Sequence, residues 1–278
     1  MAKGIDVSKW NGEIDWKKVW EATKSSARMG APFERSESGT GIEFAMIREG
    51  YGRNNPNQVD KNFHTNIKNA LDSGIHCGVY HYSYAVDVQD AVNEANFCLE
   101  NIKGYSLEYP VAFDIEDKSM KNLGKRILTD ICKAFCDTIE QHGYYVAIYT
   151  NVNWLENYLF KDELLTKYDL WLADWNKDKP SYSCGLWQFS NKGCVYGING
   201  DVDMNLSYKN YPKIIKNKGL NGFANDTNYF TYTVKKGDTL WTLSKIFLGS
   251  GTKYKEIKKL NNLTKDTIYV GQILKIPK

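Results

Sequence analysis

Short runs of apolar and β-branched residues alternate with amphipathic stretches along the first 208 residues. The runs that predict β-strands span 4–8, 44–50, 76–83, 109–116, 145–150, 169–175, 184–190 and 201–205. Apolar residues at helical spacing predict helices over 15–27, 60–73, 87–102 and 122–142. Strands that alternate with helices indicate parallel pairing, whereas the last strands, separated by turn residues, favour an antiparallel closure. The pattern predicts an α/β fold, an irregular TIM-like (β/α) barrel of eight strands.

Polar side chains recur at the predicted ends of these strands. They are Asp6, Arg48, Tyr80, His81, Tyr82, Asp114, Glu116, Tyr149, Asp174, Trp175, Gln188 and Asp203. Barrels of this type collect their active sites at the C-terminal ends of the strands. One such residue would carry little information, but the recurrence on nearly every strand predicts a shared polar site at one end of the barrel.

Two carboxylates lie two residues apart at the end of a buried strand, in Phe113-Asp114-Ile115-Glu116. Because strand side chains alternate between faces, Asp114 and Glu116 are expected to point the same way. Two carboxyl groups at that spacing hinder each other's ionisation, so one pKa rises and that group can act as an acid near neutral pH. Such a pair suits glycoside hydrolysis, although the same pair can also simply face solvent.

The rest of the chain is organised differently. Residues 209–229 lose the strand periodicity and are rich in Lys, Gly and Asn, which predicts a linker. Residues 230–278 predict a strand, two helices and a final strand, a small βααβ domain near the lower size limit for an independent core. Residues 25–43 form a polar excursion that we interpret as a surface loop or hairpin without an assigned function.

Composition narrows the possible functions. A chain with 42% hydrophobic and 25% charged residues is ordinary for a globular protein, and it contains no apolar run long enough to insert into a membrane. Aromatic residues make up 14% of the chain, which suits stacking on sugars, with an aromatic core as the alternative explanation. The N-terminus enters a strand-like run at once, so no signal peptide is expected.

Charge is distributed unevenly along the chain. Residues 230–278 carry 10 Lys and 3 acidic residues, a net charge of +7 against −4 for the remainder. A basic tail behind an acidic body suggests a polyanionic partner, and teichoic acid and nucleic acid both have this character. A solvated, lysine-rich surface explains the same composition equally well.

Several enzyme classes lack their sequence signature here. The six Cys show no paired CxxC spacing and the four His show no HExxH spacing, so no metal site and no metallopeptidase or amidase is predicted. A Cys–His peptidase is allowed by composition but has no local motif. Phosphate-binding and dinucleotide fingerprints are also missing, so no cofactor is expected.

Seven short motifs in residues 1–208 occur in a familiar order and spacing. They are Gly4-Ile5-Asp6-Val7-Ser8 with Trp10, Ala45 to Gly52, Gly78 to Tyr82, Asp114-Ile115-Glu116, Leu170 to Trp175, Leu186 to Ser190, and Gly200 to Asn205. Together they resemble the muramidases of glycoside hydrolase family 25, the Chalaropsis-type lysozymes. The 25–43 excursion is longer than the family pattern usually allows.

The tail has motifs of its own, in Gly237-Asp238-Thr239-Leu240-Trp241, Asn261-Asn262-Leu263 and Gly271 to Pro277. These resemble a LysM module. The resemblance implies binding of N-acetylglucosamine-containing glycans between the loops 237–240 and 264–268. The implied glycan-binding residues are Gly237, Asp238, Thr239, Leu240 and Ile268.

The first resemblance implies hydrolysis of the β-1,4 bond between N-acetylmuramic acid and N-acetylglucosamine. It implies Glu116 as the general acid, kept protonated by an anionic Asp114 and aromatic surroundings. Asp114 would orient the substrate's own 2-acetamido group, and Asp6 and Asp203 would add negative charge. The residues expected to contact sugars are Arg48, Tyr80, Tyr82, Tyr149, Trp175 and Gln188.

A muramidase joined to a LysM module, without a signal peptide, looks like a bacteriophage endolysin of a Gram-positive host. Such a protein is expected in the host cytoplasm until a holin releases it to the wall. The alternatives are a cellular autolysin, a glucosaminidase or chitinase, and a non-catalytic wall-binding protein. Expected partners are peptidoglycan strands, N-acetylglucosamine and anionic wall polymers, with no nucleic acid and no membrane insertion.

Overall fold

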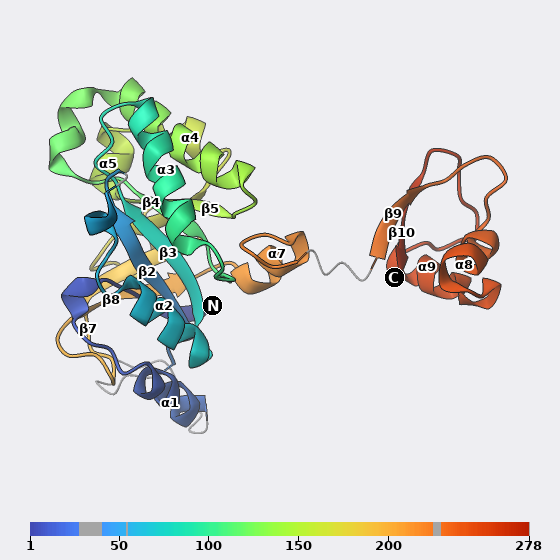
Figure 1. Ribbon diagram of the computed structural model, residues 1–278, viewed down its shortest axis with the longest axis horizontal. Coiled ribbons are helices and arrows are strands. Elements are labelled where there is room, and N and C mark those ends of the chain that lie inside the picture. Colours follow the sequence, from blue (N-terminus) through green and yellow to red (C-terminus); the bar gives the residue numbers. More distant parts are fainter. Residues whose placement is uncertain (28–40, 54, 225–228, 278) are drawn as a thin grey trace. The chain divides into compact units, whose positions relative to one another are not determined.

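The computed structural model describes residues 1–27, 41–53, 55–224 and 229–277 (Figure 1). The chain divides into two compact units, Met1–Phe223 and Ala224–Lys278, and each is described by itself. No helix within the described residues is long and apolar enough to cross a membrane. Most of the 25–43 excursion, residues 28–40, lies outside the described residues.

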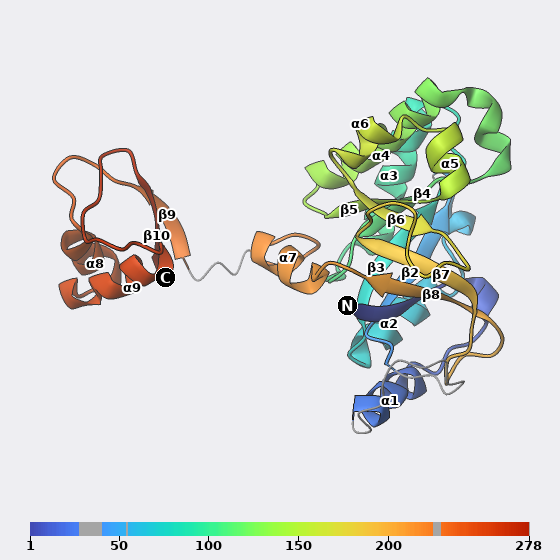
Figure 2. The same ribbon diagram turned by 180° about the vertical axis from the view of Figure 1, so that it is seen from behind.

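Eight strands of the first unit close into a barrel in sequence order. They are β1 (Ala2–Val7), β2 (Phe44–Tyr51), β3 (His76–Tyr82), β4 (Val111–Asp114), β5 (Val146–Asn151), β6 (Asp169–Ala173), β7 (Leu186–Gly193) and β8 (Val202–Ser207). Neighbours from β1 to β7 are parallel, whereas β8 runs antiparallel to both β7 and β1. Figure 2 shows the side on which β6, β7 and β8 follow one another. The prediction of an irregular eight-stranded barrel is confirmed.

The long helices occupy the predicted positions between the early strands (Figure 1). They are α1 (Trp16–Ala27), α2 (Phe63–Asp72), α3 (Val88–Ile102) and α4 (Lys125–Gln141). Single turns of 3₁₀-helix cover Lys9–Asn11, Pro56–Gln58 and, slightly longer, Lys118–Leu123. The short helices α5 (Val152–Asn157) and α6 (Lys161–Leu165) were not predicted, because one or two turns do not produce a recognisable period.

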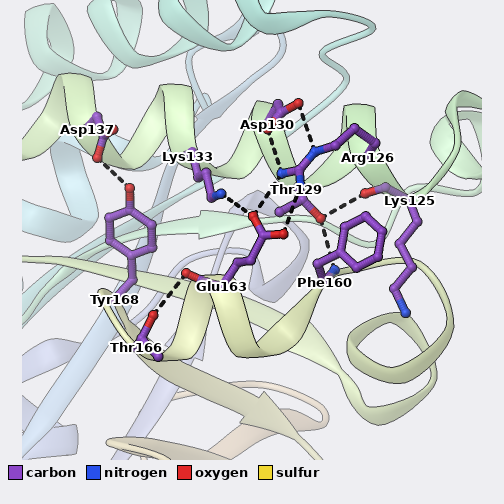
Figure 3. A network of polar contacts seen from close by, with 10 residues as sticks. All are labelled: Lys125, Arg126, Thr129, Asp130, Lys133, Asp137, Phe160, Glu163, Thr166 and Tyr168. Atoms are coloured by element: carbon purple, nitrogen blue, oxygen red, sulfur yellow. Dashed lines mark hydrogen bonds and ion pairs between the residues drawn. The ribbon is translucent and has the colours of Figure 1, made fainter.

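Helix α6 is attached to α4 by an ion-pair network (Figure 3). The Glu163 carboxylate accepts hydrogen bonds from Arg126 at 2.8 and 3.1 Å and is also paired with Lys133, while Arg126 in turn binds Asp130. These side chains are partly exposed to solvent. Solvent screening therefore limits what each pair adds to stability.

Alternation along each strand separates two apolar layers. In β4, Val111 and Phe113 face the helices, whereas Ala112 belongs to the cluster inside the barrel. The lower interior is filled by rings, with Phe44 stacked on Tyr109 at 4.2 Å between centroids. The same alternation directs Asp114, at the end of β4, toward the interior.

The barrel unit extends beyond residue 208, so the predicted 209–229 linker is wrong over most of its length. Residues Tyr211–Lys218 form helix α7, whose Tyr211 and Ile215 are buried in the inner apolar cluster. The following Asn221 is also buried, and its side chain accepts from the Tyr145 N–H at 2.6 Å and donates to the Tyr109 carbonyl at 2.8 Å. Two apolar residues one turn apart gave too weak a period to predict this helix.

The second unit has the predicted βααβ order. It contains β9 (Tyr229–Thr233), α8 (Leu240–Leu248), α9 (Tyr254–Leu260) and β10 (Ile273–Pro277), with one 3₁₀ turn at Gly251–Lys253. The two strands pair antiparallel. Its small core consists of Val234, Leu240, Leu243, Ile257, Leu274 and Ile276.

We expect Asn221→Ala to destabilise the barrel unit although it lies far from the strands in sequence. The substitution leaves the buried Tyr145 N–H and Tyr109 carbonyl without this partner, and Asn221 has a left-handed φ of 56° that alanine adopts poorly. The expected loss is about 2 to 4 kcal/mol in the free energy of unfolding, measured by urea denaturation. Asn217→Ala on the exposed face of α7 is the control, and equal effects of the two would contradict the prediction.

Candidate active site

A groove of about 330 Å³ opens at the rim of the barrel where the parallel strands end. Its carboxyl groups are Asp6, Asp114, Glu116, Asp201 and Asp203, and its aromatic side chains are Trp10, Tyr80, Tyr82, Tyr149 and Trp171. The structure thus brings together the four acids that the sequence analysis selected. Arg48 is the one basic side chain among the described residues that line this groove.

Asp203 reaches the groove from the opposite strand direction. The sequence analysis placed it at a C-terminal strand end, but it is the second residue of β8. Because β8 is antiparallel to β1, its beginning lies at the rim where β1 ends, and Asp203 is the direct register partner of Asp6. The antiparallel closure that the sequence predicted for the last strands is what makes these two carboxyl groups neighbours, although the prediction for Asp203 did not take it into account.

Asp6 is held by amide side chains from the two closing strands. Its Oδ2 accepts hydrogen bonds from Gln188 Nε2 at 2.8 Å and from Asn205 Nδ2 at 2.7 Å. The Asn205 Oδ1 accepts in turn from the Trp171 indole N–H at 2.8 Å. Asp6 is 6% exposed, so these donors replace the water that its carboxyl group has lost.

Gln188 supports Asp6 and is not among the described residues that line the groove, so its contact with sugar stays a prediction. It is buried, and its Oε1 accepts from the Tyr149 hydroxyl at 3.1 Å and the Trp175 indole N–H at 2.9 Å. Trp175 is partly exposed but is not among the groove-lining residues. The hydrogen bonds connect Trp175 through Gln188 to Asp6, behind the groove.

Burial raises the pKa of both Asp6 and Asp203. For Asp6, the negative charge of Asp203 adds to the effect of burial, while the hydrogen bonds from Asn205 and Gln188 oppose it. Burial is also the leading cause of the raised pKa of Asp203. Two adjacent carboxyl groups in this situation hold one proton between them at a pH where isolated aspartates would both be ionised.

Asp114 is the most enclosed acid of the groove, at 4% exposure. Its backbone carbonyl accepts from the Ser83 N–H at 2.9 Å, which secures the end of β4 against β3. Its Oδ1 is buried and has no hydrogen-bond partner among the described residues. Burial, followed by the charges of Glu116 and Asp6, raises the pKa of Asp114 well above its usual range, and Arg48 opposes the rise.

Glu116 lies two residues further on and is less enclosed. Burial raises its pKa, the hydrogen bond from Asn151 Nδ2 to Oε2 at 3.1 Å opposes this, and the charges of Asp203 and Asp117 add to it. The sequence analysis expected an anionic Asp114 to keep Glu116 protonated. In the structure, burial and the charges of Asp203 and Asp117 raise the pKa of Glu116, whereas burial and the charge of Glu116 raise the pKa of Asp114.

Arg48 is anchored by an acid that the sequence analysis assigned to the start of a helix. Asp60 is buried, and its Oδ2 accepts from Arg48 Nε at 2.9 Å, from Arg48 Nη2 at 2.7 Å and from the Lys9 N–H at 3.0 Å. A charge-assisted pair of this kind holds the guanidinium in place. Its positive charge is therefore fixed beside the acids of the groove.

Aromatic rings form the floor and the rim of the groove. Trp171 meets Tyr80 and Tyr149 edge-on, with centroids 5.8 and 4.5 Å apart. Tyr82 lines one wall and donates its hydroxyl hydrogen to Asp117 at 3.0 Å. Trp10 was not selected as a site residue, yet it lines the groove and is 80% exposed. Trp10, Trp171 and Asp201 each belong to one of the seven motifs of the sequence analysis, and this membership was the signal by which they could have been selected.

The predicted glycan-binding residues of the second unit have clear structural roles. Asp238 accepts from the Lys235 N–H at 2.7 Å and the Tyr232 hydroxyl at 3.0 Å, and Thr239 caps α8. The Leu240 side chain lies in the core, and its prediction as part of the glycan-binding loop stays a prediction. Gly237 is exposed with a φ of 93°, whereas Ile268 packs partly against the core. Within the described residues, no group of three or more His, Cys, Asp or Glu side chains is placed to hold a metal ion.

Comparison with known families gives two matches. The model of "Glycosyl hydrolases family 25" matches residues 5–198, and the model of the "LysM domain" matches residues 232–277. The two matches fall within the two compact units of the structure.

Individual relatives agree with these matches. Lysozyme M1 of Streptomyces globisporus is 27% identical over 219 residues, which cover 73% of this chain and 66%, about two thirds, of that protein. The crystal structure of the Streptomyces coelicolor lysozyme covers 81% of this chain and 98% of its own, with a TM-score of 0.63 and 25% identity. The match to the crystal structure of the CTP1L endolysin covers 78% of this chain and 70% of that protein, with a TM-score of 0.61 and 26% identity.

We expect Asn151→Ser to raise the pKa of Glu116 further. The change removes the amide that stabilises the ionised carboxylate, whereas serine can still cap α5, where Asn151 Oδ1 accepts from the Trp154 N–H at 3.1 Å. Carboxyl NMR titration of the Glu116 side chain measures the shift. Asn153→Ser, on the exposed side of the same helix, is the control. A lowered or unchanged value for Asn151→Ser would contradict the assigned role.

Proposed function

The chain belongs to family 25 of the glycosyl hydrolases and is a glycoside hydrolase of the lysozyme type, and from this we propose that it cleaves the β-1,4 bond between N-acetylmuramic acid and N-acetylglucosamine. It is a peptidoglycan hydrolase. The observation that carries the proposal is the groove in which Asp6, Asp114, Glu116 and Asp203 are gathered over an aromatic floor. Enclosure of acids beside aromatic rings is the arrangement that holds a carboxylic acid in its protonated form near neutral pH.

Glu116 acts as the general acid. Partial burial raises its pKa, so the carboxyl group is available to protonate the glycosidic oxygen as the bond breaks. Its remaining contact with solvent allows the proton to be replaced after each turnover. Asn151 orients the carboxyl group through its hydrogen bond to Oε2.

Asp114 is too close to Glu116 in sequence to face it across a sugar ring, so the mechanism uses the substrate as its own nucleophile. The 2-acetamido oxygen attacks the anomeric carbon while Asp114 orients the acetamido group. Asp114 lines the groove, and its Oδ1 has no hydrogen-bond partner among the described residues, which supports this role.

Asp6 and Asp203 stabilise the positive charge that develops at the sugar. They are register partners across β1 and β8, and the amides of Gln188 and Asn205 fix Asp6 in position. Preoriented negative charge is more effective in an enclosed groove than in water. Tyr80, Tyr82, Tyr149 and Trp10 offer rings to the apolar faces of the sugars.

The LysM domain holds the enzyme on the wall. It binds N-acetylglucosamine in glycan strands, and its lysines also attract anionic wall polymers. Residues 230–278 carry ten Lys against three acidic residues, one of which, Asp266, pairs with Lys258, so most of the positive charge is uncompensated. Attraction of this kind weakens as salt is added.

In the organism, the enzyme acts as a phage endolysin that reaches the wall from the host cytoplasm. Likeness to the CTP1L endolysin supports this role. A cellular autolysin is the second candidate, favoured by the similarity to the Streptomyces lysozyme. Lysis that depends on a coexpressed holin would support the endolysin, and growth-linked wall turnover would support the autolysin.

We expect Glu116→Gln to lower the rate of peptidoglycan hydrolysis at least about a hundredfold, because a glutamine cannot deliver the proton. Loss of turbidity of purified cell walls measures the rate. The matched control is Glu163→Gln, which changes an acid of the α4–α6 network outside the groove and should leave hydrolysis intact. Near-normal turnover by Glu116→Gln would end the assignment.

The same digests identify the bond that is cut. New reducing ends on N-acetylmuramic acid indicate a muramidase, whereas new reducing ends on N-acetylglucosamine indicate a glucosaminidase. A protein that binds walls without any loss of turbidity would be a non-catalytic binder.

Removal of residues 230–278 is expected to weaken wall attachment more than cleavage of soluble glycan. The two compact units have separate cores, so the barrel keeps its groove without the LysM domain. Cosedimentation with cell walls measures attachment, and release of reducing ends from soluble fragments measures cleavage. Equal loss of both activities would show that the tail supports the barrel.

A further inference from the structure

A buried charged cluster lies directly behind the groove and takes no part in the mechanism above. It consists of Glu49 on β2, His81 on β3 and Glu94 on α3, all with 0% exposure. The His81 Nδ1 is hydrogen-bonded to Glu49, and its Nε2 lies 3.8 Å from Glu94 Oε2. Glu49 also accepts from Asn101 Nδ2 at 2.8 Å. None of these side chains lines the groove.

The position of the imidazole between two carboxyl groups favours its protonated form. Two carboxylates enclosed without water are stabilised by an imidazolium between them, whereas a neutral ring would leave one of them without a counter-charge. Burial by itself lowers the pKa of His81, but the attraction of Glu49 and Glu94 outweighs it and the pKa lies above its usual 6.5.

The other described groups that pack against the imidazole are mostly uncharged. Phe97 from α3 and Phe135 from α4 cover the ring, and the backbone of Gly52 faces it. The Cys98 thiol lies beside Glu49, and the charge of Asp90 acts on Glu94.

Glu94 connects the cluster to the groove wall. Its Oε2 accepts from the Ser83 hydroxyl at 2.7 Å, and its Oε1 accepts from the Tyr84 N–H at 2.9 Å. Ser83 in turn donates its backbone N–H to the carbonyl of Asp114 at 2.9 Å. The preceding residue, Tyr82, lines the groove. One side chain therefore joins the buried imidazole to the segment 82–85 and to the end of β4.

We propose that His81 is a positioning residue, whose imidazolium holds Glu49 and Glu94 together and thereby fixes the wall segment 82–85 and the end of β4 in the geometry that binds the glycan. The inference rests on the proposed function, since it assigns a role in binding peptidoglycan. It also makes glycan affinity depend on pH through a residue that never touches the substrate.

The sign of that dependence follows from the raised pKa. The attraction of the His81 imidazolium for Glu49 and Glu94 is lost as the pH rises through the raised pKa of His81. On the acid side it ends where Glu94 takes up a proton, and burial raises the pKa of that carboxyl group as well. Without its proton the imidazole no longer attracts both carboxylates, and the wall segment loosens. KM should therefore increase on the alkaline side, whereas the alkaline decline of kcat follows Glu116.

The unaltered full-length chain provides the first test, by NMR titration of its four histidines between about pH 5 and pH 9. His81 should lose its proton at a higher pH than the exposed His64 and His142, and the ring signals of Tyr82 and Tyr84 should shift at the same pH. The proposal would be overturned if His81 lost its proton at the same pH as the exposed histidines. It would also be overturned if the tyrosine signals did not change when His81 loses its proton. This measurement needs no hydrolysis, so it stays decisive even if the proposed reaction is wrong.

Steady-state kinetics on soluble peptidoglycan fragments provide the second test. His81→Asn should raise KM about tenfold at neutral pH, the size of a lost charge-assisted interaction, with kcat within about twofold and the alkaline rise of KM abolished. The matched control is His76→Asn at the other end of β3, where Nδ1 pairs with Glu108 Oε2 at 2.6 Å away from the groove. That control should leave KM and its pH dependence unchanged.

A second variant covers the case in which His81→Asn does not fold. Ser83→Ala removes the hydroxyl that donates to Glu94 and accepts from the Ala85 N–H at 3.2 Å, and it leaves the three charged side chains in place. It should raise KM several-fold while the NMR titration of His81 stays as in the unaltered chain. Unchanged KM in Ser83→Ala, or a fall in kcat alone in His81→Asn, would overturn the positioning role.

Discussion

A carboxyl group enclosed at the mouth of a barrel loses hydration, and its charged form is stable only where protein groups replace the water. The groove places five carboxyl groups beside one guanidinium among its described lining residues. Asp6 receives two amide donors and Glu116 receives one, while Asp114 keeps an oxygen without a partner. This shortage of compensation raises the pKa values of the groove carboxyl groups, and the proposed general acid depends on it.

The direction of the last strand allows the acidic side chains to gather at one rim of the barrel. Seven parallel strands bring their C-terminal ends to one rim, and β8 closes the barrel in the opposite direction, so that Asp203 meets Asp6. A parallel eighth strand would have carried the same residue to the far end. Below the acids, Tyr80, Tyr149 and Trp171 fill the barrel and keep water from entering the groove from beneath.

The acids of the site could be predicted because alternation along a strand and the family motifs are both local properties. Asp114 and Glu116 share a face for that reason, and the structure places them in one groove. The supporting residues were harder to identify. Gln188 was expected to touch sugar but binds Asp6, and Asp60 was expected to begin a helix but holds Arg48. Their partners lie far away in the chain, so no local pattern reveals them.

The order of strands and helices, the division into a barrel and a small βααβ unit, and the identity of the acids followed from periodicity and short motifs alone. Helix α7 did not, because Tyr211 and Ile215 become meaningful only when the barrel offers an apolar surface to cover. The same holds for the chain of contacts from His81 to Asp114, which crosses β2, β3, β4 and α3. Packing alone brings such residues together, because hydrogen bonds and ion pairs depend on distance in space and not on distance along the chain.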